Sequence, residues 1–349
     1  MKVKVMCMTV CSLIVCGAAN ANSLDNISAA IDMLQPQQLS SVLVMRDNEL
    51  VYENYYNGTL ANDLHDVRSL SKSLTGLMFG KAISDGYFES EFARVLPIFD
   101  NATVLNPSTH KDEMTFFDLL SMTNPLECDD MNNLSDGHEE KMYLTRDWVS
   151  FFLSLPARAN PPWEVPMDEQ PYGRDFAYCT AGISVSAAAI EVVTGEKFST
   201  YTNTALFQPL GITESSWLYN EEGITQGGGG LKIKPRDLIK IGQLVLNNGS
   251  WSGKQIIESD WIEKSLQSYS VSMPEMNATY GLTWWHFPFE IDGRVIETHA
   301  AAGNGGNYLF VIPELNATAV ITATAYNTRY MHQQTHAILS TAILPALLN

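Results

Sequence analysis

Two candidate β-hairpins, one near each end of the chain, restrict the fold most strongly. Residues 41–55 hold two β-favouring runs around a polar turn at 46–49, and residues 308–325 repeat this pattern around a turn at 313–316. A helical pattern follows over residues 331–347. Because no strand-helix-strand rhythm accompanies the hairpins, we expect an α+β fold: an antiparallel sheet built from both ends of the chain and flanked by helices.

The middle of the chain has a different character. Residues 85–225 are rich in proline and aromatic residues and contain helical patches at 116–122, 147–155 and 182–194. This segment predicts a mainly helical second subdomain. Residues 22–84 and 226–349 then form the α/β subdomain that carries the antiparallel sheet, and the two subdomains together make one catalytic unit.

The first 21 residues have the pattern of a secretory signal peptide. Lys2 and Lys4 precede an apolar stretch, and the small residues Ala19-Asn20-Ala21 follow it. The alternative is lipidation at Cys16, although the valine before that cysteine fits a lipoprotein signal poorly. Since no later apolar run is long enough to span a bilayer, we expect a periplasmic or secreted protein without a transmembrane segment in the mature chain.

Charge and cysteine content refine this expectation. Lys and Arg number 21 against 39 Asp and Glu, a net charge of −18, so nucleic acid is not an expected partner. Loss of Lys2 and Lys4 with the signal peptide leaves 19 basic residues and a charge of −20. Of the 5 cysteines, only Cys128 and Cys179 lie outside the signal peptide. In an oxidising compartment they form either a disulfide or two separate buried thiols.

The strongest chemical signal is the pair Ser69 and Lys72. Residues three apart share one face of a helix, and an apolar pattern continues from Leu70 to a stop at Asp85-Gly86. An amine beside a hydroxyl can accept its proton and activate it as a nucleophile. The alternative is that Ser69 is only a helix N-cap and Lys72 a solvated helix residue. A second Ser-x-x-Lys, at residues 108–111, follows a proline in a polar context that predicts a loop.

Further stretches of the chain give these two residues a context. Residues 176–182, 209–212, 227–231, 280–285, 303–306 and 311–314 follow Ser69-x-x-Lys72 in an order that resembles the serine β-lactamase and penicillin-binding-protein superfamily. The resemblance is greatest to its class C-like branch, which includes esterases, D-aminopeptidases, carboxypeptidases and 6-aminohexanoate-oligomer hydrolases. It covers residues 38–345 and implies a β-lactamase-like fold and hydrolysis of small ester or amide substrates through an acyl-enzyme.

The resemblance also assigns roles to individual residues. Tyr178 takes the place of the tyrosine that faces the nucleophile, although Thr180 stands where the family has an asparagine. The family's Lys-Thr-Gly falls on Ala301-Ala302-Gly303, so the cation that binds a substrate carboxylate is missing and lactamase activity is in doubt. His299 and Arg329 are the two candidates to replace that cation; the alternative is that they are a structural histidine and a solvated loop residue.

The implied mechanism is acyl transfer. Ser69 attacks a carbonyl while Lys72 and Tyr178 share its proton, and one of these two then activates water to release the acyl group. The sequence does not decide which of them is the base. By resemblance, the Ser69 N–H and a backbone N–H just after Gly303 form the oxyanion hole, and the substrate region comprises Thr180, Ala302, Gly303, Asn304 and Gly305. We expect aromatic lining from Trp163, Tyr172, Trp284 and Trp285.

Two other functions are compatible with parts of the sequence. His332 and His336 stand four residues apart, a spacing that can bind zinc, but the glutamate of His-Glu-x-x-His and a third ligand are missing, so we expect neither a metal nor a cofactor. A non-catalytic ligand-binding module is the alternative of another class. The physiological substrate and the oligomeric state do not follow from the sequence.

Overall fold

An antiparallel sheet dominates one half of the computed structural model, which describes residues 21–158 and 175–348. Within these residues the sheet has eight strands in the order β2-β1-β13-β12-β11-β10-β9-β8. Their bounds are β1 Leu39–Arg46, β2 Glu49–Tyr55, β8 Ser270–Met273, β9 Ala278–Tyr280, β10 Trp285–Ile291, β11 Arg294–Gly303, β12 Asn307–Ile312 and β13 Ala317–Ala323. Both predicted hairpins are present, and β1 pairs directly with β13, so the expected α+β fold is confirmed.

Helices cover both faces of this sheet. On one face, α9 (Pro235–Leu246) packs against β1, β12 and β13. There Gly242 leaves no room for a side chain, because a Cβ would lie 2.6 Å from the Leu309 side chain. On the other face lie α1 (Ala21–Leu34), α11 (Met331–Ile338), the π-helical turn η8 (Leu339–Ile343) and α12 (Leu344–Leu348). Burial on both faces explains why β12 and β13 are apolar along nearly their whole length.

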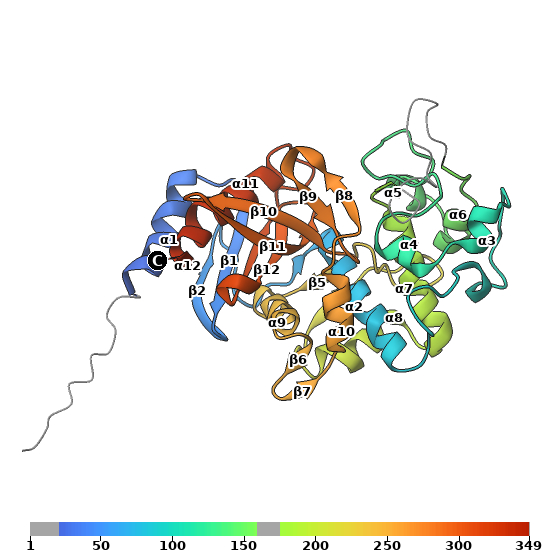
Figure 1. Cartoon of the computed structure of the whole chain (residues 1–349), viewed down its shortest axis with the longest axis horizontal. Helices are drawn as coiled ribbons and strands as arrows, with labels where there is room; N and C mark the ends of the chain where they lie inside the picture. Colours follow the sequence, from blue (N-terminus) through green and yellow to red (C-terminus); the bar gives the residue numbers. More distant parts are fainter. Residues whose placement is uncertain (1–20, 159–174, 349) are drawn as a thin grey trace, which may run out of the picture.

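The remaining helices gather at the end of the molecule opposite α1 and α12 (Figure 1). They are α3 Thr109–Glu113, α4 Phe116–Leu120, α5 Glu139–Met142, α6 Trp148–Leu153, α7 Thr180–Thr194 and α8 Phe198–Thr202, with the short turns η2 Leu96–Ile98 and η5 Asn203–Phe207. The predicted helical patches at 116–122, 147–155 and 182–194 therefore match α4, α6 and α7 to within a few residues.

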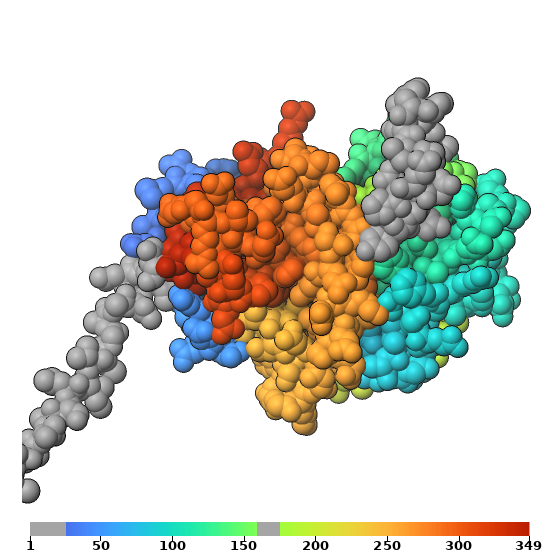
Figure 2. All heavy atoms as spheres, in the orientation of Figure 1, coloured from blue at the N-terminus to red at the C-terminus, as the bar shows by residue number. Residues whose placement is uncertain are grey.

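The two halves meet along a continuous surface. Figure 2 shows the orange surface of the C-terminal third against the cyan and teal surface of the helical part. Lys264 on α10 (Ser259–Ser265) pairs with Glu91 at 2.6 Å, and the rings of Phe117 and Tyr269 lie 5.0 Å apart. Smaller strands complete the structure: β3 His65–Asp66, β4 Ser215–Trp217, β5 Leu231–Ile233, β6 Ser250–Trp251, β7 Lys254–Gln255 and the turns η6 Pro274–Met276 and η7 Pro313–Leu315.

Helix α2 (Ser71–Ser84) runs through the centre of the molecule. Nearly all of its residues are buried, which is the pattern of a helix surrounded by protein rather than lying on a surface. Gly80 allows Trp261 to pack directly on the helix backbone, and the Trp261 indole N–H donates to the Gly76 carbonyl at 3.0 Å. The start of α2 is therefore held at a fixed place between the sheet and the helical part.

The prediction of a loop at the second Ser-x-x-Lys is wrong. Ser108 caps the short helix α3 by accepting a hydrogen bond from the Lys111 backbone N–H. The Lys111 side chain is buried and its Nζ donates to the Leu105 carbonyl. A good capping residue thus allowed a short helix to form in spite of the polar context.

Candidate active site

Ser69 lies in η1 (Arg68–Leu70), a 3₁₀ turn that leads straight into α2. The residue before it, Arg68, has a φ of +53°, a strained conformation for a side chain of this size. Ser69 is half-buried and makes no capping hydrogen bond to α2. The alternative in which Ser69 is only the N-cap of a helix therefore does not hold, and Ser69 lines a cavity instead.

Lys72 is the direct partner of Ser69. Its Nζ donates to Ser69 Oγ at 2.7 Å and to the Gly228 carbonyl at 2.6 Å. The side chain is 1% exposed, and burial lowers the pKa of Lys72 to about 8, while the negative charges of Glu139 and Asp130 act against this shift. With this pKa, roughly a tenth of Lys72 is neutral at pH 7 and able to take a proton from Ser69.

Tyr178 faces the same pair of residues. The Lys72 ammonium lies 4.8 Å from the centre of the Tyr178 ring, and both Tyr178 and Ser69 line the cavity. Burial raises the pKa of Tyr178 well above its usual value, and a hydrogen bond with Ser69 acts in the opposite direction. The phenol therefore carries its proton in the resting site, next to an amine that readily loses one.

A disulfide fixes the segment that carries Tyr178. Of the two alternatives for the cysteines, the structure contains the bond between Cys128 and Cys179, both of which are buried. Cys179 is also the N-cap of α7, where its Sγ accepts from the Gly182 N–H. The disulfide therefore connects the start of α7 to the loop that follows Leu126, immediately beside Tyr178.

Two carboxylates in this loop region belong to the site and were missed from the sequence. Asp130 accepts from the Thr180 N–H at 2.7 Å and from the Glu139 N–H at 2.8 Å, while its own N–H donates to the Tyr178 carbonyl at 2.7 Å. Burial raises the pKa of Asp130 to about 6, against the effect of the Lys72 charge. Both Asp130 and Glu139 line the cavity. Neither stands in a recognisable spacing relative to Ser69, so the sequence offered no signal for them.

The end of β11 forms the opposite wall of the cavity. Ala302, Gly303 and Asn304 line the cavity, whereas Gly305 lies behind it with its N–H directed at Met331 Sδ, 3.3 Å away. A Cβ on Gly303 would lie 2.0 Å from the Val67 carbonyl oxygen, so only glycine allows this strand to approach the Ser69 turn so closely.

Thr180 does not lie where the resemblance placed it. Its side chain is fully buried and packs on Gly228, whose carbonyl accepts from Lys72, so it supports the site from behind without lining the cavity. Its backbone N–H donates to Asp130 at 2.7 Å.

Neither candidate for the missing cation reaches the cavity. His299 packs edge to face against His286, with 4.7 Å between ring centres, and strand alternation places both on the sheet face opposite Ala302. Arg329 is exposed on the loop before α11. Among the described residues that line the cavity there is no lysine or arginine. Lys72 is not part of this lining, but its Nζ contacts Ser69 Oγ.

The aromatic residues divide between core and cavity. Trp284 is 1% exposed and belongs to the core, whereas Trp285 lines the cavity and lies 5.4 Å from the Tyr178 ring. Trp163 and Tyr172 lie outside the described residues. The expectation of an aromatic wall therefore holds for one tryptophan in the described part and fails for Trp284.

The two histidines of α11 occur beside the cavity as side chains packed on aromatic rings. His332 Nδ1 lies 2.9 Å from the Tyr308 hydroxyl, and His336 packs against Phe287 with 4.7 Å between ring centres. Residues 21–158 and 175–348 contain no cluster of three or more His, Cys, Asp or Glu able to hold a metal ion. In the same residues, no helix has the length and apolar character needed to cross a membrane.

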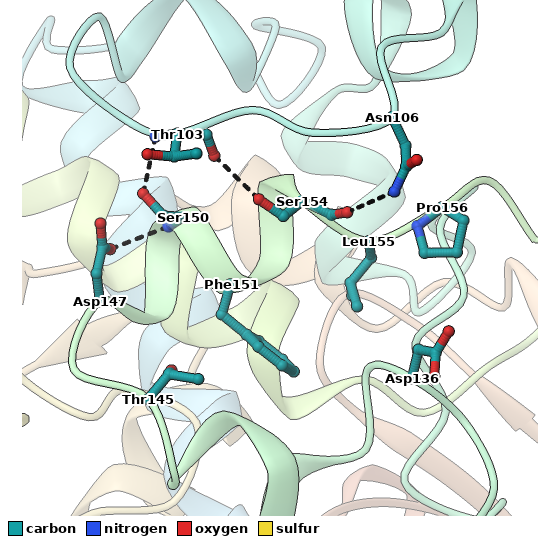
Figure 3. Close-up of a pocket in the computed structure, with 10 residues that line it drawn as sticks. All are labelled: Thr103, Asn106, Asp136, Thr145, Asp147, Ser150, Phe151, Ser154, Leu155 and Pro156. Carbon is teal, nitrogen blue, oxygen red and sulfur yellow. Dashed lines mark hydrogen bonds between the residues drawn. The ribbon is translucent and has the colours of Figure 1, made fainter.

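A second hollow lies in the helical part, beside α6 (Figure 3). Its polar side chains bind backbone groups of the same lining residues: Thr103 N donates to Ser150 Oγ at 2.8 Å, Ser154 Oγ donates to the Thr103 carbonyl at 3.2 Å, and Asn106 Nδ2 donates to the Ser154 carbonyl at 3.0 Å. These groups attach the 103–106 loop to α6. The hollow lacks a paired nucleophile and base, so the Ser69 cavity is the better candidate site.

A serine paired with a buried lysine at the start of a central helix, between an antiparallel sheet and a helical part, defines the class of β-lactamase-type and penicillin-binding proteins. A family model described as Beta-lactamase matches residues 37–343, and the chain belongs to this family. The resemblance inferred from the sequence is thus confirmed.

Individual relatives agree with this assignment. The chain is 25% identical over 256 residues to a 6-aminohexanoate-dimer hydrolase of Paenarthrobacter ureafaciens, a match that covers 70% of this chain and 63% of that protein, less than two thirds of its length. A solved structure from Bacillus anthracis, assigned as a 6-aminohexanoate-dimer hydrolase, superposes with a TM-score of 0.68 at 21% identity, covering 88% of this chain and 79% of the other. A penicillin binding protein from Bacillus halodurans gives a TM-score of 0.66 at 17% identity, with 90% and 99% covered.

Proposed function

We propose that this protein is an exported serine hydrolase that cleaves esters or amides through an acyl-enzyme. The observation that carries the proposal is the contact between Ser69 and Lys72, 2.7 Å apart, in which a buried amine with a pKa of about 8 meets a hydroxyl at the edge of a cavity. Such an amine is a suitable proton acceptor for a serine nucleophile near neutral pH. Membership in the family and the similarity to hydrolases support the same reaction.

The proposed reaction runs in two halves. Ser69 Oγ attacks the substrate carbonyl carbon while its proton passes to Lys72, and the tetrahedral intermediate then expels the alcohol or amine, which takes a proton from Lys72 or Tyr178. In the second half, Lys72 or Tyr178 takes a proton from a water molecule that attacks the acyl carbon. The bond between this carbon and Ser69 Oγ then breaks, Oγ recovers that proton and the carboxylic acid leaves. The Ser69 N–H and a backbone N–H after Gly303 would hold the oxyanion. The high pKa of Tyr178 favours Lys72 as the first base and Tyr178 as the group that relays a proton.

A β-lactamase or D-amino-acid carboxypeptidase or aminopeptidase is the second candidate. The family relationship favours it, but Ala301 stands where the carboxylate-binding lysine is expected, and neither His299 nor Arg329 lines the cavity. The substrates of β-lactamases and of D-amino-acid carboxypeptidases carry a carboxylate close to the scissile bond. We therefore rank ester and amide hydrolysis above lactamase activity, and a non-catalytic binding module below both.

The test is hydrolysis of p-nitrophenyl acetate and of a chromogenic cephalosporin by residues 22–349. We expect ester turnover that Ser69→Ala abolishes, and little or no cephalosporin turnover. Ser108→Ala is the matched control, since it changes the serine of the second Ser-x-x-Lys, a helix cap outside the cavity, and should keep full activity. Full activity in Ser69→Ala would refute the mechanism, while inactivity of the parent protein on both substrates would favour a binding module.

Export is supported by the N-terminal pattern and agrees with the disulfide, since disulfides persist mainly in oxidising compartments. Expression of the full chain in a bacterial host should give a periplasmic or secreted form whose intact mass corresponds to residues 22–349. Retention of residues 1–21 in a cytosolic product would refute the proposal.

A further inference from the structure

The cavity continues from Ser69 along a wall on which no charged side chain lies among the residues that the structure describes. This wall comes from the sheet half of the molecule: β10 contributes Trp285 and Phe287, β12 contributes Tyr308, and α11 contributes His332 and His336. Met273, Met276 and Met331 border the same space. The cavity has a volume of about 620 Å³, within the usual size range of small-molecule sites.

The carboxylates of the cavity belong to its other side. Asp130 is bonded to the start of α7 through Thr180, and Glu139 accepts a hydrogen bond from Tyr143, which in turn accepts one from Gln226. The negative charges of both carboxylates raise the pKa of Lys72, so both lie near its amine. The cavity thus has an acidic side formed by the helical half and an uncharged aromatic side formed by the sheet half.

The two histidines do not add a positive charge to the aromatic side. The His336 ring is surrounded by Phe287, Tyr308 and Phe289, at 4.7, 5.3 and 5.5 Å between ring centres, and its Nε2 is buried without a hydrogen-bond partner. Burial lowers the pKa of His336 to about 4 and that of His332 below its usual value. At neutral pH both imidazoles act as flat, uncharged surfaces that cannot pair with a carboxylate.

We propose that this wall is a substrate subsite for an uncharged aryl or branched alkyl group attached to the scissile ester or amide, with Phe287 and His336 as specificity-determining residues. The inference rests on the proposed function, because the subsite is defined relative to a carbonyl held at Ser69. Aromatic faces and methionine side chains offer favourable contacts to such a group. A carboxylate in the same position would be desolvated with no cationic partner among the described lining residues, and we expect the site to reject it.

The experiment compares matched substrates on the protein comprising residues 22–349. In the acyl arm, p-nitrophenyl phenylacetate is compared with the acetate, and the p-nitrophenyl monoester of succinic acid with p-nitrophenyl butyrate. In the leaving-group arm, benzyl acetate is compared with ethyl acetate. We expect a kcat/KM preference of about 10-fold for the aromatic substrate in at least one arm, and a loss of about 10-fold or more for the succinate monoester. The arm that shows the preference identifies the side of the scissile bond that the wall binds.

Two variants assign the preference to the wall. Phe287→Leu removes ring contacts and should reduce the aromatic-to-acetate ratio several-fold, as should Met276→Ala, which changes a partly exposed side chain and puts the fold at little risk. Phe92→Leu is the matched control: Phe92 is 59% exposed, does not line the cavity and should leave the ratio unchanged.

The outcomes separate the two proposals. If Ser69-dependent hydrolysis shows no aromatic preference in either arm, or favours the succinate monoester, the subsite is wrong while the proposed function stands. An aromatic preference that survives both Phe287→Leu and Met276→Ala also refutes it. If none of the tested esters shows Ser69-dependent turnover, the proposed function is refuted and the subsite with it.

Discussion

At the scale of single residues, the site depends on the balance of forces on Lys72. Burial lowers the pKa of its ammonium to about 8, and the charges of Glu139 and Asp130 raise it. If neutral Lys72 accepts the Ser69 proton, kcat/KM rises as pH increases through this pKa. Glu139→Gln removes one supporting charge, so the pKa falls further and the rising limb of the pH profile moves to lower pH, by roughly 0.5–1 pH unit.

The matched control for this shift is Glu314→Gln, which removes a carboxylate paired with Arg294 outside the cavity. Its pH profile should coincide with that of the parent protein. If the rising limb of the pH profile of kcat/KM lies at the same pH in Glu139→Gln as in the parent protein, another group, such as Tyr178, controls the first proton transfer.

Gly303 allows β11 to approach the turn that carries Ser69. In Gly303→Ala the new Cβ would meet the Val67 carbonyl at 2.0 Å and the Leu70 N–H nitrogen at 3.0 Å, backbone atoms on both sides of Ser69. The serine turn must shift, and we expect kcat to fall by about 10²-fold, as small misplacements of catalytic groups do. Gly253→Ala strains a φ of +75° without any close contact, so it should lower stability but not kcat. Equal kcat losses in both variants would point to general destabilisation instead.

The residues that sequence analysis found and missed differ in how they are brought together. Ser69 and Lys72 share a local helical spacing, so their contact follows from helix geometry. Tyr178 was found only through resemblance to a family. Asp130 and Glu139 reach the site because a disulfide and the start of α7 hold their loop there, and no local pattern encodes such a contact. For the same reason, the burial of Thr180 was not foreseen.

At the scale of elements, strong periodic patterns made the fold predictable. Both terminal hairpins and the helices α2, α4, α6 and α7 lie where alternation or helical spacing predicted them, whereas α1 and α9, 14 and 12 residues long, were not predicted. The positive φ of Asp47 and Asn48, +52° and +64°, suits the tight turn of the first hairpin. The pairing of β1 with β13 joins distant segments, yet it follows once both hairpins must share one sheet. The short helix α3 was missed because a single capping serine outweighed a weak local pattern.

The disulfide is the element-scale feature with the clearest measurable effect. It closes a loop across 51 residues of sequence, and bonds of this kind contribute typically about 2–4 kcal/mol to the free energy of unfolding. In Cys128→Ser/Cys179→Ser we expect a loss of this size in urea unfolding. We also expect a fall in kcat larger than the change in KM, because the bond holds Tyr178 and Asp130 in position.

A second double variant separates stability from positioning. Ser41→Ala/Thr322→Val removes a buried hydrogen bond of 2.6 Å between β1 and β13, away from the cavity. It should lower stability without reducing kcat at a temperature where both proteins are folded. If the cysteine variant keeps the kcat of the parent protein, the disulfide stabilises the fold but does not position the site.

At the scale of the whole molecule, the net charge of −18 and the two cavity carboxylates create a negative field around a site whose described lining contains no lysine or arginine. Such a field raises the local concentration of cationic substrates and lowers that of anionic ones, and salt screens it. Between about 0.01 M and 1 M ionic strength, where the Debye length falls from about 30 to 3 Å, kcat/KM for a trimethylammonium-bearing ester should fall several-fold.

Two esters of similar length provide the internal controls for this salt dependence. The tert-butyl analogue has the shape of the trimethylammonium ester without its charge, so its kcat/KM should change little, and a carboxylate-bearing ester should improve as salt rises. Opposite slopes for the two charged esters would show that the field of the protein acts on substrate binding. Equal slopes for all three would mean that salt acts on the enzyme itself, and that the acidity of the chain serves its solubility and does not select its substrate.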